Sequence, residues 1–540
     1  MSKSDTIRAA DAVASRLYEA RCRYAFGMPG GEVLTLVDAL ETAGIEFVLC
    51  KHENAAGFMA EAAWHQTGAP GIMVATIGPG VLNGVNSIAN AHQDRVPLIV
   101  LSGCVDAAEA ETYTHQVLDQ QAVLKPVTKA TFRLSAGAAH VIADKAVGIA
   151  LEGRPGPIHI DVPISTADAQ INAASPAPRA AAAATAPAGA ALHRAREWLT
   201  EAERPVMVVG LDAMNEGAGE AITAFATRFN IPVITSYKAK GLLSEDHPLS
   251  LGGAGLSPLA DRHLVPFIQS ADLVLCVGYD PIEMRPGWRD LWDARTTRVI
   301  DITAVPNHHY MHQASLNIIA DCAASLAAIG AEVEPQQTWQ GGETPALKSE
   351  LTAAFPRDED WGPAAIIDTC QRHLPADTIA TADSGAHRIL LSQMWRCTKP
   401  RGLLQSSALC TMGCALPLAM GTALCAPDRT VVSFSGDAGF LMIAGELSTA
   451  AELKIKPIFV VFVDASLALI ELKQRQRQLR NAAVDFGQHD FAAMGRAFGG
   501  AGHTVETRAE LEAALHAAQS ADTFTVIACM IERGAYDGRI

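Results

Sequence analysis

The sequence predicts an α/β protein built from three doubly wound parallel-sheet domains. Its 540 residues suggest three to four domains at roughly 150 residues per domain. Short apolar runs typical of strands alternate with longer helical patterns, which favours parallel sheets covered by helices. Two stretches, 167–191 and 334–360, interrupt this alternation because they are rich in Ala and Pro or in polar residues, and they indicate linkers.

The first predicted domain comprises residues 1–166. Its strands are expected at 47–49, 71–76, 98–102 and 158–162, and helical patterns at 54–65 and 82–92. The strand segments are apolar along their whole length, as in strands that are buried on both faces of a parallel sheet. Residues 1–6 lack the apolar core of a signal peptide, so no leader is expected.

The second and third domains follow the two linkers. A middle domain is predicted over 192–333, starting with an apolar strand pattern at 205–210. The third domain is predicted over 361–540, with strands at 431–435 and 457–463. We therefore expect three separate sheets in one chain.

Composition excludes several classes of protein. With 49% apolar and 19% charged residues, the chain is not disordered, collagenous or a small disulfide-stapled protein. Its net charge of −16 argues against general nucleic-acid binding, which needs clustered Lys and Arg. No apolar run approaches the ~18 residues of a membrane helix, so no membrane association is expected. Eleven cysteines without a Cys-x-x-Cys pair indicate reduced thiols and a cytoplasmic protein.

The strongest chemical signal lies at the ends of two strands in the third domain. One strand ends in the turn Gly436-Asp437-Ala438-Gly439, and the next ends at Asp464, 27 residues after Asp437. One helical crossover between parallel strands brings both carboxylates to the same sheet edge, where ligands bind. A helix N-terminus can bind phosphate there, and the two carboxylates suit Mg²⁺. The alternative interpretation is a tight turn that only caps a helix.

Taken with five ordered segments of the first domain, these motifs resemble the thiamine-diphosphate-dependent decarboxylase and carboligase superfamily, which includes acetolactate synthases. The five segments are 26–30, 51–56, 76–83, 94–97 and 156–163. The resemblance covers nearly the whole chain. It implies a pyrimidine-binding first domain, a middle domain and a diphosphate-binding third domain.

The resemblance also implies roles for individual residues. The metal ligands would be Asp437, Asp464 and the backbone carbonyl of Ser466, although a shifted register would put Ala465 in place of Asp464. The catalytic residues would be Glu53, which hydrogen-bonds the aminopyrimidine ring, with Gln116 and His115. Met412 would separate the two cofactor rings, and the carbonyl of Cys410 would face the pyrimidine amine. The remaining cofactor contacts would be Pro29, Gly30, Thr76, Asn83, Ser384, Gly385, Ala386, His387, Ala438, Gly439, Ala468 and Leu469.

Segments 278–283 and 483–487 are similar to the flavin-free, catabolic acetolactate synthases. The expected cofactors are therefore thiamine diphosphate and Mg²⁺, without FAD. The leading hypothesis is decarboxylation of a 2-oxoacid with carboligation. A 2-hydroxy ketone lyase, a non-oxidative 2-oxoacid decarboxylase and a non-catalytic scaffold protein are the alternatives. The resemblance further implies a homodimer at least, commonly a homotetramer, with each site between the first domain of one subunit and the third domain of another.

Overall fold

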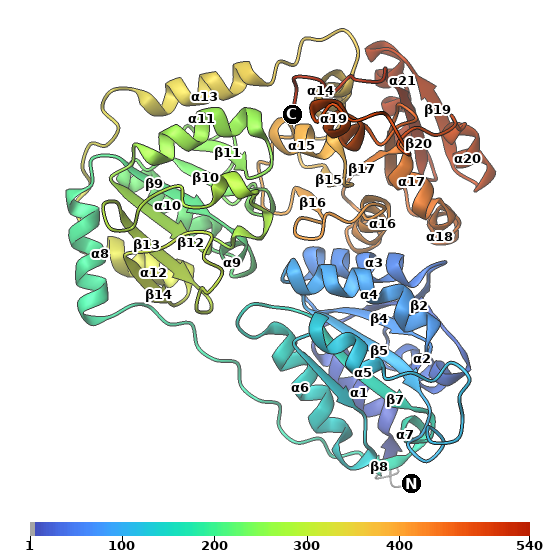
Figure 1. Cartoon of the computed structure of the whole chain (residues 1–540). Coiled ribbons are helices and arrows are strands. Elements are labelled where there is room, and N and C mark those ends of the chain that lie inside the picture. Colours follow the sequence, from blue (N-terminus) through green and yellow to red (C-terminus); the bar gives the residue numbers. More distant parts are fainter. Residues whose placement is uncertain (1–5) are drawn as a thin grey trace. The chain divides into compact units, whose positions relative to one another are not determined.

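The computed structural model describes residues 6–540, and the first five residues of the segment expected to lack a leader lie outside this range (Figure 1). Three six-stranded sheets, each wholly parallel, confirm the predicted α/β class. The chain forms two compact units. One comprises Met1–Ala182, Gly413–Asp428 and Met442–Pro457, and the other comprises Ala183–Met412, Arg429–Leu441 and Ile458–Ile540.

The first sheet belongs to the first unit and has the strand order β3-β2-β4-β5-β7-β6. Its strands are β2 (Tyr24–Met28), β3 (Glu46–Leu49), β4 (Gly71–Ala75), β5 (Leu98–Cys104), β6 (Ala130–Arg133) and β7 (Ile158–Pro163). Its helices are α1 (Ala9–Glu19), α2 (Leu34–Thr42), α3 (Glu53–Thr67), α4 (Pro79–Gln93), α5 (Gln120–Leu124), α6 (Ala139–Leu151) and α7 (Ile164–Asp168). Helices α3 and α4 lie on one face and α1 and α6 on the other (Figure 1). Strands β4, β5 and β7 are therefore buried along their whole length.

A short antiparallel ribbon joins the two ends of this domain. Strand β1 (Thr6–Arg8) pairs with β8 (Gln170–Asn172). Both α7 and β8 overlap or adjoin the range assigned to the first linker, and residues 173–188 then lack helix and strand. The boundary at 166/167 stays a prediction.

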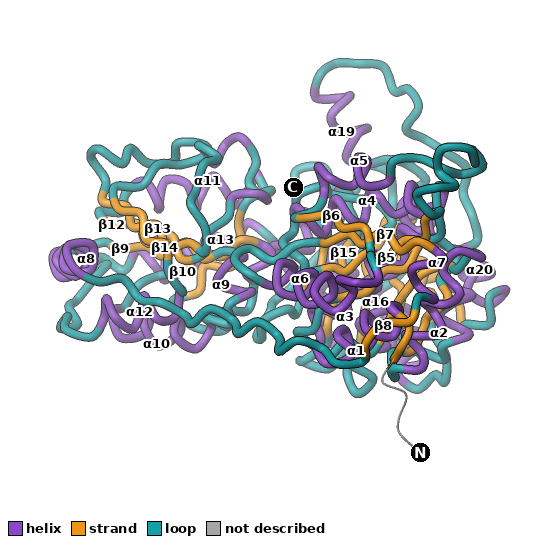
Figure 2. Tube along the Cα trace, turned by 90° about the horizontal axis from the view of Figure 1, so that it is seen from below, coloured by secondary structure: helices purple, strands orange, loops and turns teal. Residues whose placement is uncertain are grey.

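The middle sheet has the order β11-β10-β9-β12-β13-β14. Its strands are β9 (Pro205–Val209), β10 (Val233–Ser236), β11 (Ser250–Ala254), β12 (Leu273–Val277), β13 (Arg298–Thr303) and β14 (Leu316–Ile319). Its helices are α8 (Gly189–Glu201), α9 (Leu211–Asn215), α10 (Gly219–Phe229), α11 (Pro258–Gln269) and α12 (Cys322–Gly330). Figure 2 shows the strands between α11 on one face and α10 and α12 on the other.

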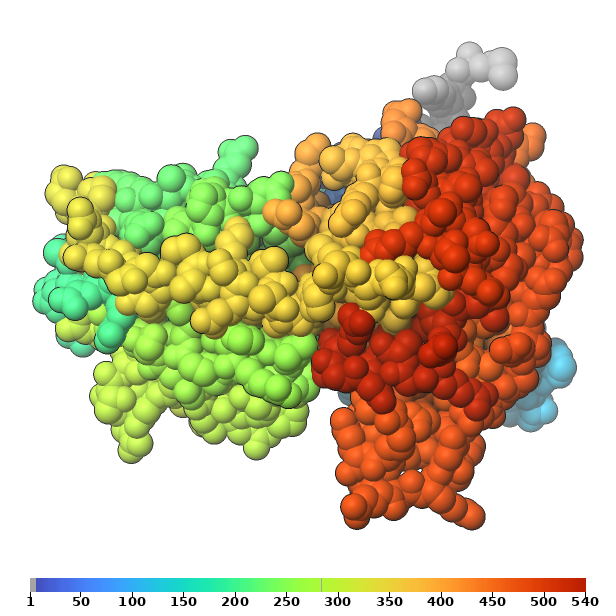
Figure 3. Space-filling view, turned by 90° about the horizontal axis from the view of Figure 1, so that it is seen from above, coloured from blue at the N-terminus to red at the C-terminus, as the bar shows by residue number. Residues whose placement is uncertain are grey.

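The third sheet has the order β16-β15-β17-β18-β20-β19. Its strands are β15 (Ile379–Ala382), β16 (Leu403–Gln405), β17 (Val431–Gly436), β18 (Ile458–Val463), β19 (Ala501–Val505) and β20 (Thr525–Met530). Its helices are α14 (Pro363–His373), α15 (Ala386–Met394), α16 (Ala415–Cys425), α17 (Asp437–Ile443), α18 (Leu447–Glu452), α19 (Ala468–Gln476), α20 (Phe491–Ala497) and α21 (Arg508–Gln519). The range 334–360 contains α13 (Glu343–Ala354), and Figure 3 shows it crossing the surface as a yellow band.

Helices α16 and α18 leave the third sheet and join the first unit. Helix α16 packs on α3 around Phe58, Ala62, Cys414 and Leu418. Gly421 is needed here, because a Cβ at this position would lie 2.6 Å from the carbonyl oxygen of Met59. Small residues on both helices therefore allow a close approach of α16 to the helix that begins with Glu53.

Within residues 6–540, no helix is both long and apolar enough to span a bilayer.

Candidate active site

The strand orders of the first and third sheets place the predicted site residues at topological switch points. In each sheet the sequence order reverses between two neighbouring strands, β2 and β4 in the first and β15 and β17 in the third. Loops that leave such strands at their carboxyl ends form the usual ligand crevice of an open α/β sheet. Gly30 follows β2, Thr76 follows β4, His387 follows β15 and Asp437 follows β17.

Asp437 and Asp464 lie together at the carboxyl edge of the third sheet. Asp437 Oδ2 accepts hydrogen bonds from the backbone N–H groups of Ala465 (2.7 Å) and Asp464 (3.2 Å), and its Oδ1 accepts one from Ala438 (2.8 Å). Asp464 Oδ1 accepts from the Ser466 N–H at 3.1 Å. These bonds explain why an aspartate follows β17: its carboxylate fixes the turn that follows β18.

Both carboxylates carry unfavourable electrostatics in the protein alone. Burial raises the pKa of Asp437, and burial together with the charge of Asp437 raises the pKa of Asp464 to about 7. Two buried like charges disfavour their shared ionisation. A divalent cation between them would remove that penalty.

His387 follows β15 in the sequence, in the first turn of α15, and lines the same cavity as the two carboxylates. It is 3% exposed, its ring stacks on Phe462 with centroids 5.4 Å apart, and burial lowers its pKa to about 3, so the ring is neutral. Its Nε2 and the Oγ of Ser384 have no hydrogen-bond partner. A Cβ on Gly385 would lie 2.7 Å from the His387 ring, so this position must remain glycine.

A cavity of about 660 Å³ opens at this edge of the sheet. The first residues of α15, α17 and α19 line it, and each helix N-terminus presents backbone N–H groups and a positive dipole end. Of the predicted cofactor contacts, the structure brings the following together around the cavity: Ser384, Gly385, Ala386, His387, Cys410, Met412, Asp437, Ala438, Gly439, Asp464, Ser466, Ala468 and Leu469.

The loop that carries Cys410 and Met412 is held by a residue that sequence reasoning missed. The Arg388 guanidinium donates to the carbonyl of Ser406 and, at 3.1 Å, to the sulfur of Cys410. Cys410 has a positive φ of 53°, a strained conformation for a residue with a side chain. Arg388 therefore fixes the backbone from which Met412 reaches the cavity.

Glu53 is the first residue of α3, in the first unit. His52 caps this helix, since its Nδ1 accepts from the Asn54 N–H at 3.1 Å. The Glu53 side chain is 5% exposed, and its Oε2 accepts from Asn83 Nδ2 at 3.0 Å. A Cβ on Gly80 would lie 3.1 Å from Glu53 Oε1, so a side chain at this position would press against the Glu53 carboxylate.

The other predicted residues of this unit lie around the same loops. Thr76 Oγ1 donates to Glu32 Oε2 at 2.6 Å, and a Cβ on Gly30 would collide with Thr76 at 2.1 Å. Pro29 is exposed beside it. The structure thus brings the loops after β2 and β4 together.

Gln116 and His115 lie in the exposed segment between β5 and α5. The carbonyl oxygen of Gln116 lies 2.6 Å from where a Cβ on Gly78 would be, which places this segment against the loop that leads to Gly80. The His115 ring makes an edge contact with Tyr113, with centroids 6.3 Å apart. Neither side chain shows a direct contact with Glu53.

Comparison with known proteins matches three parts of the chain to the domains of one enzyme family. Residues 7–123 match the family model described as "Thiamine pyrophosphate enzyme, N-terminal TPP binding domain", 192–329 match the central domain and 383–529 the C-terminal TPP binding domain. The chain is 30% identical to an acetolactate synthase of Bacillus subtilis (strain 168) over 532 residues, covering 96% of this chain and 92% of the relative. This chain belongs to the thiamine diphosphate enzyme family. Other relatives are the catabolic acetolactate synthase of Raoultella terrigena (28% identical; 97% and 95% covered) and an acetolactate synthase large subunit of Parasynechococcus marenigrum (31%; 94% and 85%).

The residues around the cavity suit the cofactor of a thiamine diphosphate enzyme. The Ser384 Oγ, which has no partner among the described residues, can donate to a phosphate oxygen, and the helix N-termini favour an anion. The oxygen ligands of Asp437 and Asp464 are those that Mg²⁺ prefers, with the diphosphate completing its shell. The chemistry of the donor set therefore fits both groups.

Two further residues of this thiamine diphosphate enzyme escaped sequence reasoning. Glu446 is fully buried, and its Oε1 accepts from the N–H groups of Lys51 (2.7 Å) and His52 (2.8 Å), directly before Glu53. Tyr536 is buried against the cavity, and burial followed by the charges of Asp464 and Asp437 raises its pKa well above the usual value. Neither residue belongs to a local motif, because its partners come from distant parts of the chain.

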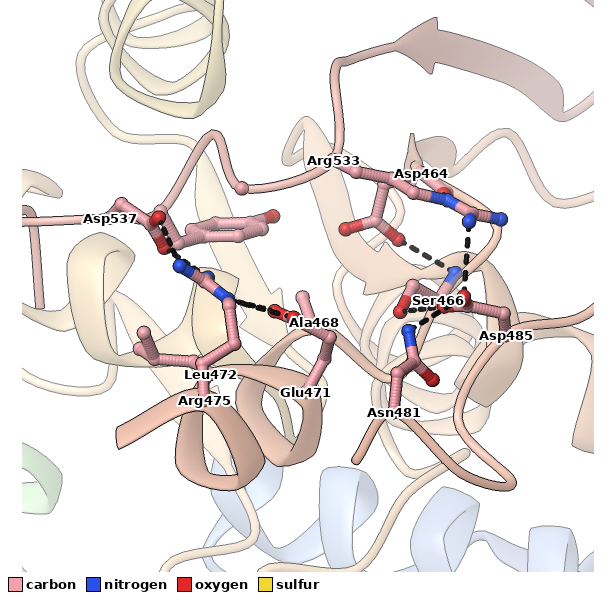
Figure 4. Close-up of a pocket in the computed structure, with 12 residues that line it drawn as sticks. Asp464, Ser466, Ala468, Glu471, Leu472, Arg475, Asn481, Asp485, Arg533 and Asp537 are labelled. Atoms are coloured by element: carbon pink, nitrogen blue, oxygen red, sulfur yellow. Dashed lines mark hydrogen bonds and ion pairs between the residues drawn. The ribbon is translucent and has the colours of Figure 1, made fainter. Parts of the chain in front are cut away.

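A second, smaller cavity of about 210 Å³ is lined by Asp464, one of the two carboxylates at the edge of the third sheet (Figure 4). Arg475 bridges Glu471 and Asp537 at 2.7 Å each, and Arg533 pairs with Asp485 at 3.0 Å. Asp485 also accepts from Ser466 Oγ at 2.8 Å. These partly exposed pairs contribute little energy individually, but they hold the segment after α19 and the chain end beside Ser466.

Proposed function

We propose that this thiamine diphosphate enzyme decarboxylates a 2-oxoacid and joins the remaining fragment to an acceptor carbonyl, with pyruvate as donor and acetolactate as product. The observation that supports this most directly is the match to acetolactate synthases over almost the full length of both chains. When bound, thiamine diphosphate supplies a carbon nucleophile that also accepts the electrons released as CO₂ leaves. The protein supplies binding, orientation and charge.

We assign Glu53 as the residue that handles a proton at the pyrimidine end. Its carboxylate is buried and fixed by Asn83, so its position is defined before any ligand arrives. Gln116 and His115 are proposed to contact the substrate from the loop beside Gly78. Met412 and the carbonyl of Cys410 are proposed to set the bend of the cofactor, with Pro29, Gly30, Thr76 and Asn83 as pyrimidine-side contacts.

At the other end, we propose Mg²⁺ bound by Asp437, Asp464 and the Ser466 carbonyl. We propose Asp464 and not Ala465 as the second ligand, because Ala465 has no ligand atom in its side chain. Ser384, Gly385, Ala386, His387, Ala438, Gly439, Ala468 and Leu469 are proposed as the diphosphate cradle. FAD is not part of this proposal. We also keep the three-domain division, and a cytoplasmic location, which the eleven free cysteines support.

The test of the reaction is an assay with pyruvate that measures CO₂, acetolactate, acetoin and acetaldehyde separately. We expect CO₂ and acetolactate in equal amounts. CO₂ with acetaldehyde alone would identify a decarboxylase, and no turnover of pyruvate would reject the synthase assignment.

The matched test of Glu53 uses a second buried glutamate of the same helix. Glu61 Oε2 accepts from Asn90 Nδ2 at 2.9 Å, as Glu53 accepts from Asn83. Glu53→Gln should lower kcat by about 10²- to 10⁴-fold, the usual contribution of a positioned acid or base. Glu61→Gln should leave kcat within about twofold of the wild type. Equal effects of both substitutions would reject the catalytic role of Glu53.

We propose a homodimer at least, and a homotetramer as the working assembly, with sites shared between subunits. Mixing Glu53→Gln protein with Asp437→Ala protein tests this. If each site takes Glu53 from one subunit and Asp437 from another, mixed dimers contain one intact site and activity returns. If both residues act within one chain, every site stays defective and the mixture remains inactive.

A further inference from the structure

The middle domain contains a buried group of metal-ligating side chains that plays no part in the proposed reaction. Cys276 on β12 pairs directly with Asp301 on β13 in the parallel register, so both side chains point to the same face of the sheet. His312, from the segment between β13 and β14, lies over them. One ligand atom from each of Cys276, Asp301 and His312 lies within 4.8 Å of the other two.

We propose that Cys276, Asp301 and His312 bind one divalent transition-metal ion, with Zn²⁺ as the best match, at a site independent of the Mg²⁺ and cofactor site. A sulfur and an imidazole nitrogen together favour Zn²⁺, whereas Mg²⁺ prefers oxygen ligands alone. The donor set therefore differs in kind from Asp437 and Asp464.

The distances leave room for such an ion. Since no two ligand atoms are more than 4.8 Å apart, a point within about 2.8 Å of all three exists. Zinc bonds are about 2.0–2.3 Å long, so side-chain shifts of roughly half an ångström would complete them. His312 Nε2 and Asp301 Oδ2 share a hydrogen bond of 3.3 Å, which holds these two side chains together.

Unsatisfied buried atoms are a second, independent indication. Asp301 is 1% exposed and His312 4%, yet Asp301 Oδ1 and His312 Nδ1 have no hydrogen-bond partner. Asp301 Oδ2, by contrast, accepts from Asn307 Nδ2 at 3.0 Å and shares a hydrogen bond with His312 Nε2 at 3.3 Å. A buried carboxylate oxygen without a donor destabilises the fold, and coordination of a cation would offset that cost.

The surroundings suit a bound ion. The rings of Tyr279 and Trp292 lie 5.1 and 5.4 Å from the His312 ring and fix its orientation. A cavity of about 290 Å³ is lined by His312 and Asn307, which gives a path for entry and room for a water as fourth ligand. Binding would convert the Cys276 thiol to a thiolate and release one proton to solvent, with no change of oxidation state.

Cobalt provides the decisive spectroscopic probe. The full-length protein is stripped with a chelator, loaded with Mg²⁺ and thiamine diphosphate to fill the other site, and titrated with Co²⁺. We expect a thiolate-to-cobalt charge-transfer band that saturates at about one equivalent per chain and disappears on adding Zn²⁺. A site made of carboxylates alone gives no such band. Absence of the band, or saturation far from one equivalent, would overturn the proposal.

Two substitutions and one control assign the band. Cys276→Ala should abolish it, and His312→Gln should weaken Co²⁺ binding by at least about tenfold. Cys370→Ala is the matched control, because Cys370 is an equally buried thiol in α14 whose pKa is raised by burial alone. A band that survives Cys276→Ala, or that Cys370→Ala removes, would contradict the assignment. If Cys276→Ala fails to fold, His312→Gln decides: zinc should raise the melting temperature of the wild type and leave that of His312→Gln unchanged, and an equal rise in both would reject the site.

Discussion

Glu446 should control the start of helix α3, and with it the position of Glu53. Its carboxylate reaches across 395 residues of sequence to the Lys51 N–H and 394 to the His52 N–H, and both bonds end on the same oxygen, Oε1. The second oxygen accepts from Thr449 Oγ1 at 2.8 Å. Burial raises the pKa of Glu446, and these hydrogen bonds oppose that rise.

The magnitude follows from counting the groups that each substitution leaves unpaired. Glu446→Ala removes the acceptor of two backbone N–H groups, and each unsatisfied buried group costs about 1–3 kcal/mol. Lys51 is partly buried and His52 exposed, so water replaces part of the loss, and we expect about 2–3 kcal/mol of local destabilisation. Glu446→Gln keeps an oxygen that can accept both bonds, so it should cost only about 1 kcal/mol for the lost charge.

Amide hydrogen exchange of residues 51–56, read by mass spectrometry, measures this local opening directly. Protection should fall by about 30- to 150-fold in Glu446→Ala and about fivefold in Glu446→Gln, and kcat should fall in the same order. Glu452→Ala is the control, because Glu452 is exposed and binds the side chains of Lys51 (2.8 Å) and Ser448 (3.0 Å) but no backbone N–H of residues 51–56. Protection in Glu446→Ala equal to that in Glu452→Ala would refute the reasoning.

Three further predictions follow from the site. Gly80→Ala places a Cβ 3.1 Å from Glu53 Oε1 and should lower kcat by about 10- to 100-fold, whereas Gly137→Ala, with open space around it, should leave kcat unchanged in the same pyruvate assay. Burial lowers the pKa of His387 from about 6.5 in the unfolded chain to about 3 in the folded protein, so the unfolded state binds the proton first. Below pH 6.5 the stability of the cofactor-free protein should therefore fall by up to about 1.4 kcal/mol per pH unit. Denaturant titrations at several pH values should show that stability depends less steeply on pH in His387→Phe. Asp464→Ala should weaken Mg²⁺-dependent binding of thiamine diphosphate in calorimetry by at least about tenfold, and Asp464→Asn by less because its amide oxygen can still bind the ion; equal losses would argue against Asp464 as a ligand.

The sequence alone could predict the sheets and the strand-end residues, because the signals for both are local. The apolar run of β18 and the turn Gly436-Asp437-Ala438-Gly439 each specify their own structure, and parallel pairing then brings Asp437 and Asp464 to one edge. The predicted α/β class with three parallel sheets is confirmed for the same reason. Hydrophobic periodicity reports burial, and burial in turn determines the layers.

The supporting residues could not be predicted, because their roles depend on contacts between distant segments. Nothing near Glu446 indicates that it will accept from Lys51, and nothing near Arg388 indicates a bond to Cys410, 22 residues later. Strand β8 was also missed, since it pairs only with β1 at the other end of the domain and has one buried face at most. Tertiary hydrogen bonds of this kind leave no periodic trace in the sequence.

Charge at the site explains how a chain of net charge −16 can bind an anionic cofactor. Two arginines that line the cavity are already engaged, Arg285 by Asp261 at 2.8 Å and Arg388 by Ser406 and Cys410. The helix N-termini, the proposed metal ion and Lys473, a third cation that lines the cavity, are left to meet the diphosphate. Without that metal ion, Asp437 and Asp464 would repel the diphosphate, so each ligand should strengthen the binding of the other by the same factor. The two carboxylates thus make the cofactor site depend on its metal, whatever the net charge of the chain.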